Sequence, residues 1–194
     1  MITFNNISKK FGKASALENV SFDIDKGEVH ALLGENGAGK STLLNILHGI
    51  YTNYEGNVFI DGEEINFKNT NEAINSGIVK VHQEVMSITE LTAGQNIALG
   101  NEPTKGLMID YEKLYNTTDV FLKRLGCNFD SRTSIKNLSV GEIQMVSIAK
   151  ALYQNAKIIS FDEPTAALSD NEVEVFLNVV KELKKAGITI IYVT

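Results

Sequence analysis

The sequence has little cysteine, little proline and no long hydrophobic run. One cysteine, Cys127, and two prolines in 194 residues exclude a disulfide scaffold, a collagen-like repeat and a disordered low-complexity chain. The lone thiol suits a reducing compartment and is most simply a small core residue. No segment approaches the ~20 apolar residues of a membrane-spanning helix, and Met1 leads into a strand-like run instead of a signal peptide. We therefore expect a soluble, cytoplasmic chain that reaches a membrane only through a partner.

Basic residues are also in the minority. There are 18 lysines and arginines against 24 aspartates and glutamates, which gives a formal net charge of −6. This balance argues against binding along a nucleic-acid backbone, because such binding needs a basic face. His30, His48 and His82 are scattered, with no cysteine or histidine nearby at metal-ligand spacing, so no zinc site is expected. With 43% hydrophobic and 22% charged residues, the composition is that of an ordinary globular domain.

Hydrophobic periodicity predicts strands that alternate with helices. The expected strands are Thr3–Ile7, Val20–Ile24, Val29–Leu33, Asn57–Ile60, Ile78–His82, Lys157–Phe161 and Ile188–Val193. The expected helices include Lys40–His48, Glu72–Ser76, Tyr111–Leu125, Ile143–Tyr153 and Asn171–Ala186. Capping-box spacing, in which Ser or Thr precedes Glu or Gln by three residues, occurs at Thr92, Ser139 and Ser169. This order predicts an α/β fold with a mainly parallel sheet, preceded by two antiparallel strands.

A mostly helical stretch separates the first strands from the last ones. We interpret the chain as one domain in three segments. Residues 1–83 would hold an antiparallel β subdomain and part of the core, 84–153 an inserted helical subdomain, and 154–194 the rest of the core. The chain stops at Thr194, at the tip of an expected strand, so we expect a domain that is truncated at its C-terminal end.

The most specific motif is a glycine-rich loop between an expected strand and an expected helix, with GxxxxGK[ST] spacing. Glycines let such a loop curl until its backbone N–H groups face a phosphate, and the helix N-terminus adds partial positive charge. Lys40 would supply a cation to the β- and γ-phosphates of a nucleotide and Ser41 a hydroxyl to Mg²⁺. A chance glycine-rich turn is the alternative, which the intact strand–loop–helix context disfavours. The expected nucleotide-binding residues here are Gly34, Asn36, Gly37, Ala38, Gly39, Lys40, Ser41 and Thr42.

Two carboxylates follow the apolar run Lys157–Phe161. Asp162 would hold Mg²⁺ through its water shell, and Glu163 would orient or deprotonate the attacking water. Because adjacent strand residues point to opposite faces, a shared site requires the chain to turn at Glu163, where Pro164 follows directly. A solvated strand end is the alternative, and the phosphate loop elsewhere in the chain makes the catalytic interpretation the better one.

With these two motifs and the pentapeptide Leu138–Glu142 (LSVGE), the chain resembles the ATP-binding cassette ATPases. The pentapeptide corresponds to that family's LSGGQ signature and departs from it at Val140 and Glu142. The resemblance implies that the signature closes over the γ-phosphate of ATP bound to a second ATPase domain, with Ser139 and Gly141 as ligands. Ser139 and Glu142 also fit a capping box that needs no ligand, and one helix start can serve both purposes.

Weaker positions follow the same resemblance. Gln83 matches the family's Q-loop glutamine, which touches Mg²⁺ or the lytic water and senses the transmembrane partner. Phe11 lies where the family places an aromatic ring under adenine, with core packing as the rival interpretation. The segment Ala166–Ser169 holds the D-loop position, although Ser169 also fits a helix cap.

Further segments resemble the monosaccharide-importer ATPases: Val81–Glu84, Leu91–Glu102, Gln144–Leu152 and Asp162–Leu168. Those proteins carry two ATPase halves on one chain, and this sequence looks like the first half, with the switch histidine expected directly after Thr194. The resemblance implies that two halves in a head-to-tail sandwich hydrolyse ATP with Mg²⁺. It also implies transmembrane permease subunits as partners, an indirect link to a sugar-binding protein, and a location on the inner face of the cell membrane.

Three alternatives stay open on the sequence. One is a cassette ATPase for nucleoside or other solute uptake, or a soluble one in translation or repair; the importer-like Val81–Glu84 disfavours the soluble version. Another is a different P-loop class such as a GTPase, for which the chain lacks an Asn-Lys-x-Asp guanine reader. The third is that the 194 residues bind nucleotide without turning it over.

Overall fold

The structure is a computed structural model that describes residues 1–81 and 87–194. The chain folds as two compact units. The first consists of Met1–Lys80, Ala156–Glu163 and Val180–Thr194, and the second of Val81–Asn155 and Pro164–Val179. In the part of the chain that is described, no helix combines the length and apolar character that crossing a membrane requires.

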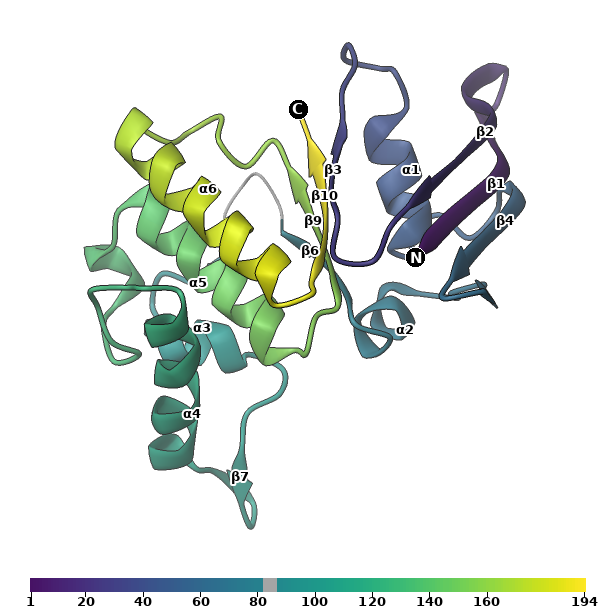
Figure 1. Cartoon of the computed structure of the whole chain (residues 1–194). Coiled ribbons are helices and arrows are strands. Elements are labelled where there is room, and N and C mark those ends of the chain that lie inside the picture. The colour runs from purple at the N-terminus through teal and green to yellow at the C-terminus, as the bar shows by residue number, and fades with distance from the viewer. Residues whose placement is uncertain (82–86) are drawn as a thin grey trace. The chain divides into compact units, whose positions relative to one another are not determined.

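An antiparallel sheet opens the first unit (Figure 1). Its strands, in the order β2-β1-β4-β5, are β1 (Ile2–Phe11), β2 (Ala14–Ile24), β4 (Glu55–Ile60) and β5 (Glu63–Ile65). The pairing of β1 with β2 continues to Phe11 and Ala14, so both strands are longer than the predicted runs. Register shifts between Phe4 and Lys10 interrupt the alternation of buried and exposed residues, which is why periodicity alone ends these strands too early.

The second sheet of this unit carries the parallel strands. Its order is β3 (Val29–Leu32), β10 (Thr189–Val193), β9 (Ile158–Asp162) and β6 (Ile78–Val81). Strand β10 runs parallel to both β3 and β9, and Val193 pairs with Leu32 on one side and with Asp162 on the other. The carboxyl ends of these three strands therefore share one edge, where ligands bind in open α/β sheets. The predicted α/β fold with a parallel and an antiparallel sheet is confirmed.

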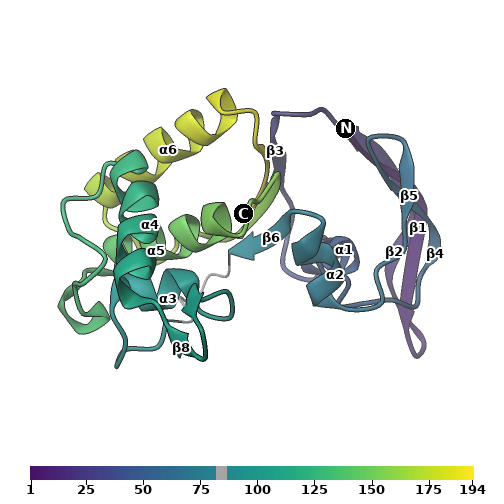
Figure 2. The same cartoon turned by 90° about the horizontal axis from the view of Figure 1, so that it is seen from below.

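Helices α1 (Lys40–Leu47) and α2 (Thr70–Asn75) lie between the two sheets (Figure 2). Leu44 and Leu47 of α1 are fully buried in a core that also contains residues of β1, β2, β4, β6, β9 and β10. Each such side chain contributes about 1.5–3 kcal/mol relative to an exposed one. The apolar face of the helix that follows the glycine-rich loop is thereby fixed in the core of the first unit.

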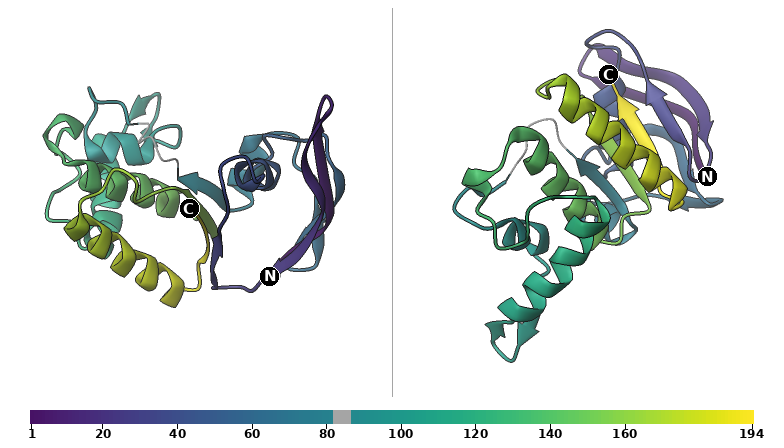
Figure 3. Two further views of the ribbon diagram at one scale, coloured as in Figure 1. Left: turned by 90° about the horizontal axis from the view of Figure 1, so that it is seen from above. Right: turned by 60° about the vertical axis from the view of Figure 1, so that its left-hand side comes forward.

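The second unit is mostly helical. Its elements are α3 (Ala93–Ala98), the hairpin β7 (Thr104–Lys105) and β8 (Met108–Ile109), α4 (Tyr111–Arg124), a 3₁₀ turn (Ile135–Asn137), α5 (Val140–Tyr153) and the first part of α6 (Asp170–Lys185). The hairpin projects from the N-terminal end of α4 (Figure 3). Ile97, Leu122 and Val146 bring α3, α4 and α5 together in one buried cluster. The capping boxes predicted at Thr92 and Ser139 both form.

A candidate nucleotide-binding site

The glycine-rich loop joins β3 to α1 as a tight backbone turn. The N–H of Ala38 donates to the carbonyl of Glu35 at 3.1 Å, and the helix begins after Gly39, whose φ is 90°. Residues 35–42 line a pocket of about 140 Å³ together with Glu163 and Val193. The exposed loop thus bounds a small polar hollow at the carboxyl edge of the parallel strands.

Lys40 places its cation inside the turn of this loop. Its Nζ donates to the carbonyl oxygens of Gly34 and, at 3.1 Å, of Glu35. The side chain therefore folds back over the loop instead of extending into solvent. An ammonium group held there can reach an anion in the pocket by exchanging carbonyl partners for phosphate oxygens.

Gly39 lies against the neighbouring strand β2. A Cβ atom at this position would be 2.4 Å from the carbonyl oxygen of Ala16 and 2.7 Å from Cδ2 of Leu17. Both contacts are far closer than real side chains tolerate, and the φ of 90° already disfavours any residue with a Cβ. The glycine is thus required by space as well as by backbone conformation.

We expect Gly39→Ala to lower the free energy of unfolding by about 2–4 kcal/mol, because it combines left-handed strain with a backbone clash. Gly37→Ala is the matched control, since Gly37 has a φ of 87° and nothing within 4 Å of its added Cβ. It should cost only the strain, about 1–2 kcal/mol. Urea unfolding of both variants measures the difference, and equal losses would contradict the role of the close approach.

The two carboxylates lie at the end of β9, as the sequence predicts. Asp162 is the last residue of the strand, and Glu163 has a φ of 46°, so the chain does turn there. The N–H of Glu163 donates to the carbonyl of Val193 at 3.0 Å, which holds the turn against the neighbouring strand. A non-glycine residue in the left-handed region carries strain that the surroundings must hold in place. The turn brings Glu163 into the pocket formed by the glycine-rich loop.

Asp162 forms an ion pair that the sequence did not reveal. Nζ of Lys80, on β6, lies 2.9 Å from its Oδ2, and the two side chains are 11% and 22% exposed. The partners are 82 positions apart, so no local pattern could pair them. The lysine thus fixes one carboxylate oxygen of Asp162 at the end of β9.

Replacement of Lys80 by methionine should lower the free energy of unfolding by about 1–3 kcal/mol, because it leaves the carboxylate of Asp162 partly buried without a partner. This loss of stability is smaller than that caused by breaking a fully buried ion pair, because both side chains keep some contact with water. Lys80→Arg keeps the charge and should retain most of the stability. Chemical denaturation decides the matter, and equal losses for the two variants would show that packing rather than charge is lost.

A buried hydrogen bond ties the end of α1 to the same strand. The Nε2 of His48 and the Oγ of Ser160 are 2.6 Å apart, and the two residues are 4% and 0% exposed. His48 is therefore a structural residue at the C-terminal end of α1, linking the helix that starts at Lys40 to the strand that ends at Asp162. Its isolated place in the sequence carried no sign of this role.

Phe11 is part of an exposed aromatic group at the end of β1. Its ring is 45% exposed and meets Tyr51 edge to face, with centroids 5.2 Å apart. Nζ of Lys9 lies 5.2 Å from the centroid of Phe11 and 5.7 Å from that of Tyr51. Burial in the core, the rival interpretation, does not describe this ring. Stacking of adenine on Phe11 stays a prediction, and Tyr51 joins it as a residue that the sequence did not single out.

The predicted residues do not all gather in one pocket. Within the described ranges, neither Asp162, Phe11 nor Gly34 is among the residues that line the hollow of about 140 Å³. Gln83 lies outside the described residues, and its role stays a prediction. Ser139 and Gly141 belong to the second unit, where they form a site of their own.

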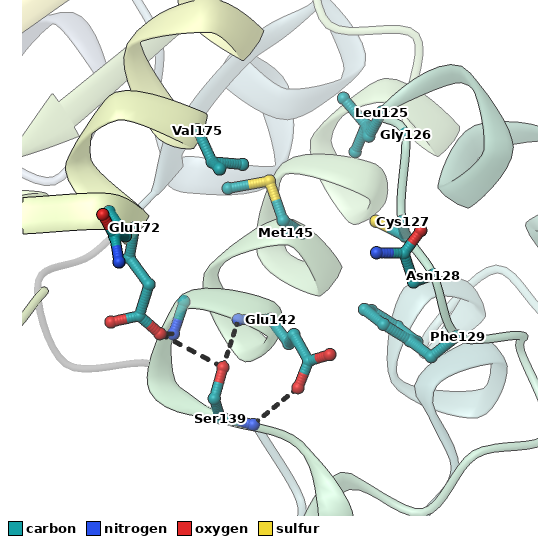
Figure 4. Close-up of a pocket in the computed structure, with 12 residues that line it drawn as sticks. Leu125, Gly126, Cys127, Asn128, Phe129, Ser139, Glu142, Met145, Glu172 and Val175 are labelled. Carbon is teal, nitrogen blue, oxygen red and sulfur yellow. Dashed lines mark hydrogen bonds between the residues drawn. The ribbon is translucent and has the colours of Figure 1, made fainter. Parts of the chain in front are cut away.

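Ser139 begins helix α5 with both hydrogen bonds of a capping box. The N–H of Glu142 donates to the Ser139 hydroxyl at 3.2 Å, and the N–H of Ser139 donates to the Glu142 carboxylate at 2.8 Å (Figure 4). The hydroxyl of Ser139 and the N–H of Gly141 each donate to Oε1 of Glu172, both at 3.1 Å. The two predicted ligands therefore do converge on a single acceptor oxygen, which a residue of α6 supplies.

Glu172 is held as a carboxylate. Its pKa is lowered to about 2, first by the hydroxyl and N–H of Ser169 and then by the N–H of Gly141 and the hydroxyl of Ser139. The sequence predicted Glu172 only as the capping partner of Ser169. Beside it lies a pocket of about 230 Å³ with a largely apolar lining that includes Cys127, Met145 and Val175 (Figure 4).

The thiol of Cys127 is expected to react slowly. Burial raises its pKa to about 11, and the negative charge of Glu142 adds to the effect. Since the thiolate is the nucleophile, alkylation by iodoacetamide at pH 8 should be on the order of 100-fold slower than for a free thiol of unperturbed pKa. Mass spectrometry measures the rate in the native and urea-unfolded chain, and equal rates would contradict the burial of the thiol.

Comparison with known proteins places these features in a family. Residues 17–166 match the family described as ABC transporter. The chain is 47% identical over 196 residues to the xylose import ATP-binding protein XylG of Thermoanaerobacter pseudethanolicus, with 100% of this chain and 39% of that protein covered. It is 45% identical over 194 residues to the galactose/methyl galactoside import ATP-binding protein MglA of Clostridium perfringens, covering 100% and 38%. The chain thus spans about two fifths of the length of these relatives.

Solved structures agree with the sequence relatives. An ATP-binding cassette of an ABC transporter in its ADP conformation has a TM-score of 0.85 and 31% identity, over 99% of this chain and 80% of that one. A dimeric ATP-binding cassette in a post-hydrolysis state, bound to ADP and Pi, has a TM-score of 0.79 and 32% identity, over 100% and 88%. The glycine-rich loop, the strand ending in Asp162 and the signature segment lie within or beside the matched range. The chain belongs to the ABC transporter family.

Proposed function

We propose that the chain is an ATP-binding and ATP-hydrolysing half of an importer that takes up a monosaccharide. The observation that carries the proposal is the pocket in which Lys40, Ser41 and Glu163 meet, formed by two motifs more than 120 residues apart. Relatives that align with the whole chain are named for the import of xylose, of galactose and methyl galactoside, and of arabinose. The pocket supports the nucleotide chemistry, and the relatives support the cargo.

The chain's own residues divide the work on ATP. Lys40 and the N–H groups of the loop bind the phosphates and spread their negative charge. Glu163 accepts a proton from the attacking water, and its left-handed backbone aims the carboxylate at the pocket instead of along the strand. Hydrolysis on such a site is mainly positioning and charge stabilisation.

The oxygen donors at this edge suit Mg²⁺. The hydroxyl of Ser41 lines the pocket and the carboxylate of Asp162 ends the adjacent strand, and both are ligands of the type that this ion prefers. When bound, Mg²⁺ would neutralise charge on the phosphates. Lys80 holds one oxygen of Asp162 at 2.9 Å, so the other oxygen is the one available to the ion's water shell.

The partners follow from the same proposal. A second ATPase half would supply the signature that completes this site, and Ser139 with Gly141 would complete the site of that half. Transmembrane permease subunits would hold the pair at the inner face of the membrane, and a sugar-binding protein would deliver the cargo to them. A dimeric cassette among the similar structures supports the pairing of two halves.

Uptake by the complete importer tests the proposal. Membrane vesicles containing the permease and the full ATPase are supplied with ATP and a panel of labelled pentoses, hexoses and nucleosides. We expect ATP-dependent accumulation of at least one monosaccharide, lost in the Lys40→Ala variant. Accumulation of nucleosides alone, or of no sugar while ATP is still hydrolysed, would contradict the proposed cargo.

A further inference from the structure

Glu172 is bound on both of its carboxylate oxygens. Oε1 accepts from the hydroxyl of Ser139 and the N–H of Gly141, both at 3.1 Å. Oε2 accepts from the N–H of Ser169 at 3.0 Å and from its hydroxyl at 2.7 Å. Oε2 thus holds Ser169 at the start of α6, where a capping residue is needed. Oε1 holds the signature, as Figure 4 shows.

The hydrogen bonds to Oε1 use the donors that a phosphate would need. A hydroxyl and a backbone N–H at a helix N-terminus form an anion site, and the carboxylate already fills it. A Cβ added to Gly141 would lie 2.6 Å from Oε1, so the carboxylate rests directly on the open face of this glycine. A phosphate oxygen and Oε1 cannot both bond Ser139 and Gly141 in this arrangement.

We propose that Glu172 is an internal competitor for the signature, whose carboxylate must leave Ser139 and Gly141 before the γ-phosphate of ATP on the second half can bind there. The inference rests on the proposed function, because it assumes that the signature receives such a phosphate. Glu172 therefore sets the ATP concentration at which the two halves close. The bonds to Ser169 can persist while Oε1 turns away, so closure does not require α6 to lose its cap.

The charge of Glu172 strengthens the competition. The hydrogen bonds that it accepts keep the carboxylate ionised, and a like charge next to an incoming phosphate is unfavourable. Glutamine at this position removes the charge while its amide oxygen can still accept from Ser169. Glu172→Gln therefore separates the competition from the capping role.

Equilibrium binding of ATP to the full two-half protein tests the proposal, with ATP hydrolysis recorded in parallel. We expect Glu172→Gln to tighten the apparent Kd for ATP about 3- to 10-fold, the range for loss of one charge-assisted competitor. Glu174→Gln is the matched control, because Glu174 is exposed on the same helix and carries the same charge. It should bind ATP like the unaltered protein.

The other outcomes are equally decisive. If Glu172→Gln leaves ATP affinity unchanged or lowers it, or if Glu174→Gln raises ATP affinity by the same factor, Glu172 does not compete with the phosphate. A purely structural role of the Glu172 hydrogen bonds would not lead to tighter ATP binding when they are lost. Should Glu172→Gln fail to fold, Glu172→Asp answers the same question. The aspartate side chain is one methylene too short to reach both Ser139 and Ser169, so we expect this variant also to bind ATP more tightly. Absence of hydrolysis in the unaltered protein contradicts the proposed function, whereas hydrolysis with no change in Kd contradicts this inference alone.

Discussion

Lys40→Ala is expected to abolish ATP binding at ordinary concentrations. Its ammonium group already lies inside the curl of the loop, bonded to the carbonyls of Gly34 and Glu35, where phosphate oxygens would meet it. Loss of one partner of a desolvated charge pair costs about 2–5 kcal/mol, or roughly 30- to several-thousand-fold in Kd. Isothermal titration of the chain with ATP measures the effect directly.

Among the described residues that line the pocket, no second cation is present to replace this lysine. Of the described residues that line the pocket, Lys40 alone carries a positive charge, whereas Glu35 and Glu163 are both acidic. Lys10→Ala is the control, since it removes the same charge from an exposed position on β1. It should leave the affinity within about twofold, because surface charges are screened. Undiminished ATP affinity in Lys40→Ala would show that the loop is not the binding site.

Glu163→Gln should separate binding from hydrolysis. Glutamine has the same shape and can keep the left-handed turn at this position, but it cannot accept a proton from water. In the proposed two-half protein we expect ATP affinity within about threefold of normal. Hydrolysis at the altered site should fall about 10²- to 10⁴-fold, the usual contribution of a positioned acid–base group.

Phosphate release under saturating ATP measures this loss, and the exposed Glu18→Gln serves as the charge control. A decrease of less than about threefold would mean that Glu163 is not the base. A loss of ATP binding of the same size as the loss of hydrolysis would instead assign the carboxylate a role in holding the nucleotide.

Features that depend on neighbouring residues were predictable from the sequence. The residue types and their spacing predict both the loop around Lys40 and the strand before Asp162. The shared edge of parallel strands then accounts for their meeting, because Val193 pairs with the ends of both β3 and β9. The turn at Glu163 followed from the geometry of a strand, in which adjacent side chains point to opposite faces.

Contacts between residues far apart in the chain were not predictable. The pairing of Lys80 with Asp162 and of His48 with Ser160 depends on which strands and helices become neighbours, and no local pattern encodes it. Glu172 shows the limit most clearly. The four consecutive residues Ser169–Glu172 predict that Glu172 caps the helix at Ser169. Its second carboxylate oxygen, however, accepts hydrogen bonds from the signature, more than 30 positions away in the sequence.

We infer that residues 34–42 hold the phosphates of ATP, and a crystal structure of the chain with Mg²⁺ and a non-hydrolysable ATP analogue would show whether they do. We expect the triphosphate in the hollow of the loop, against its N–H groups and the ammonium of Lys40, with Glu163 facing the γ-phosphate. Nucleotide bound at another surface, beside a loop whose Lys40 still bonds Gly34 and Glu35, would contradict that claim.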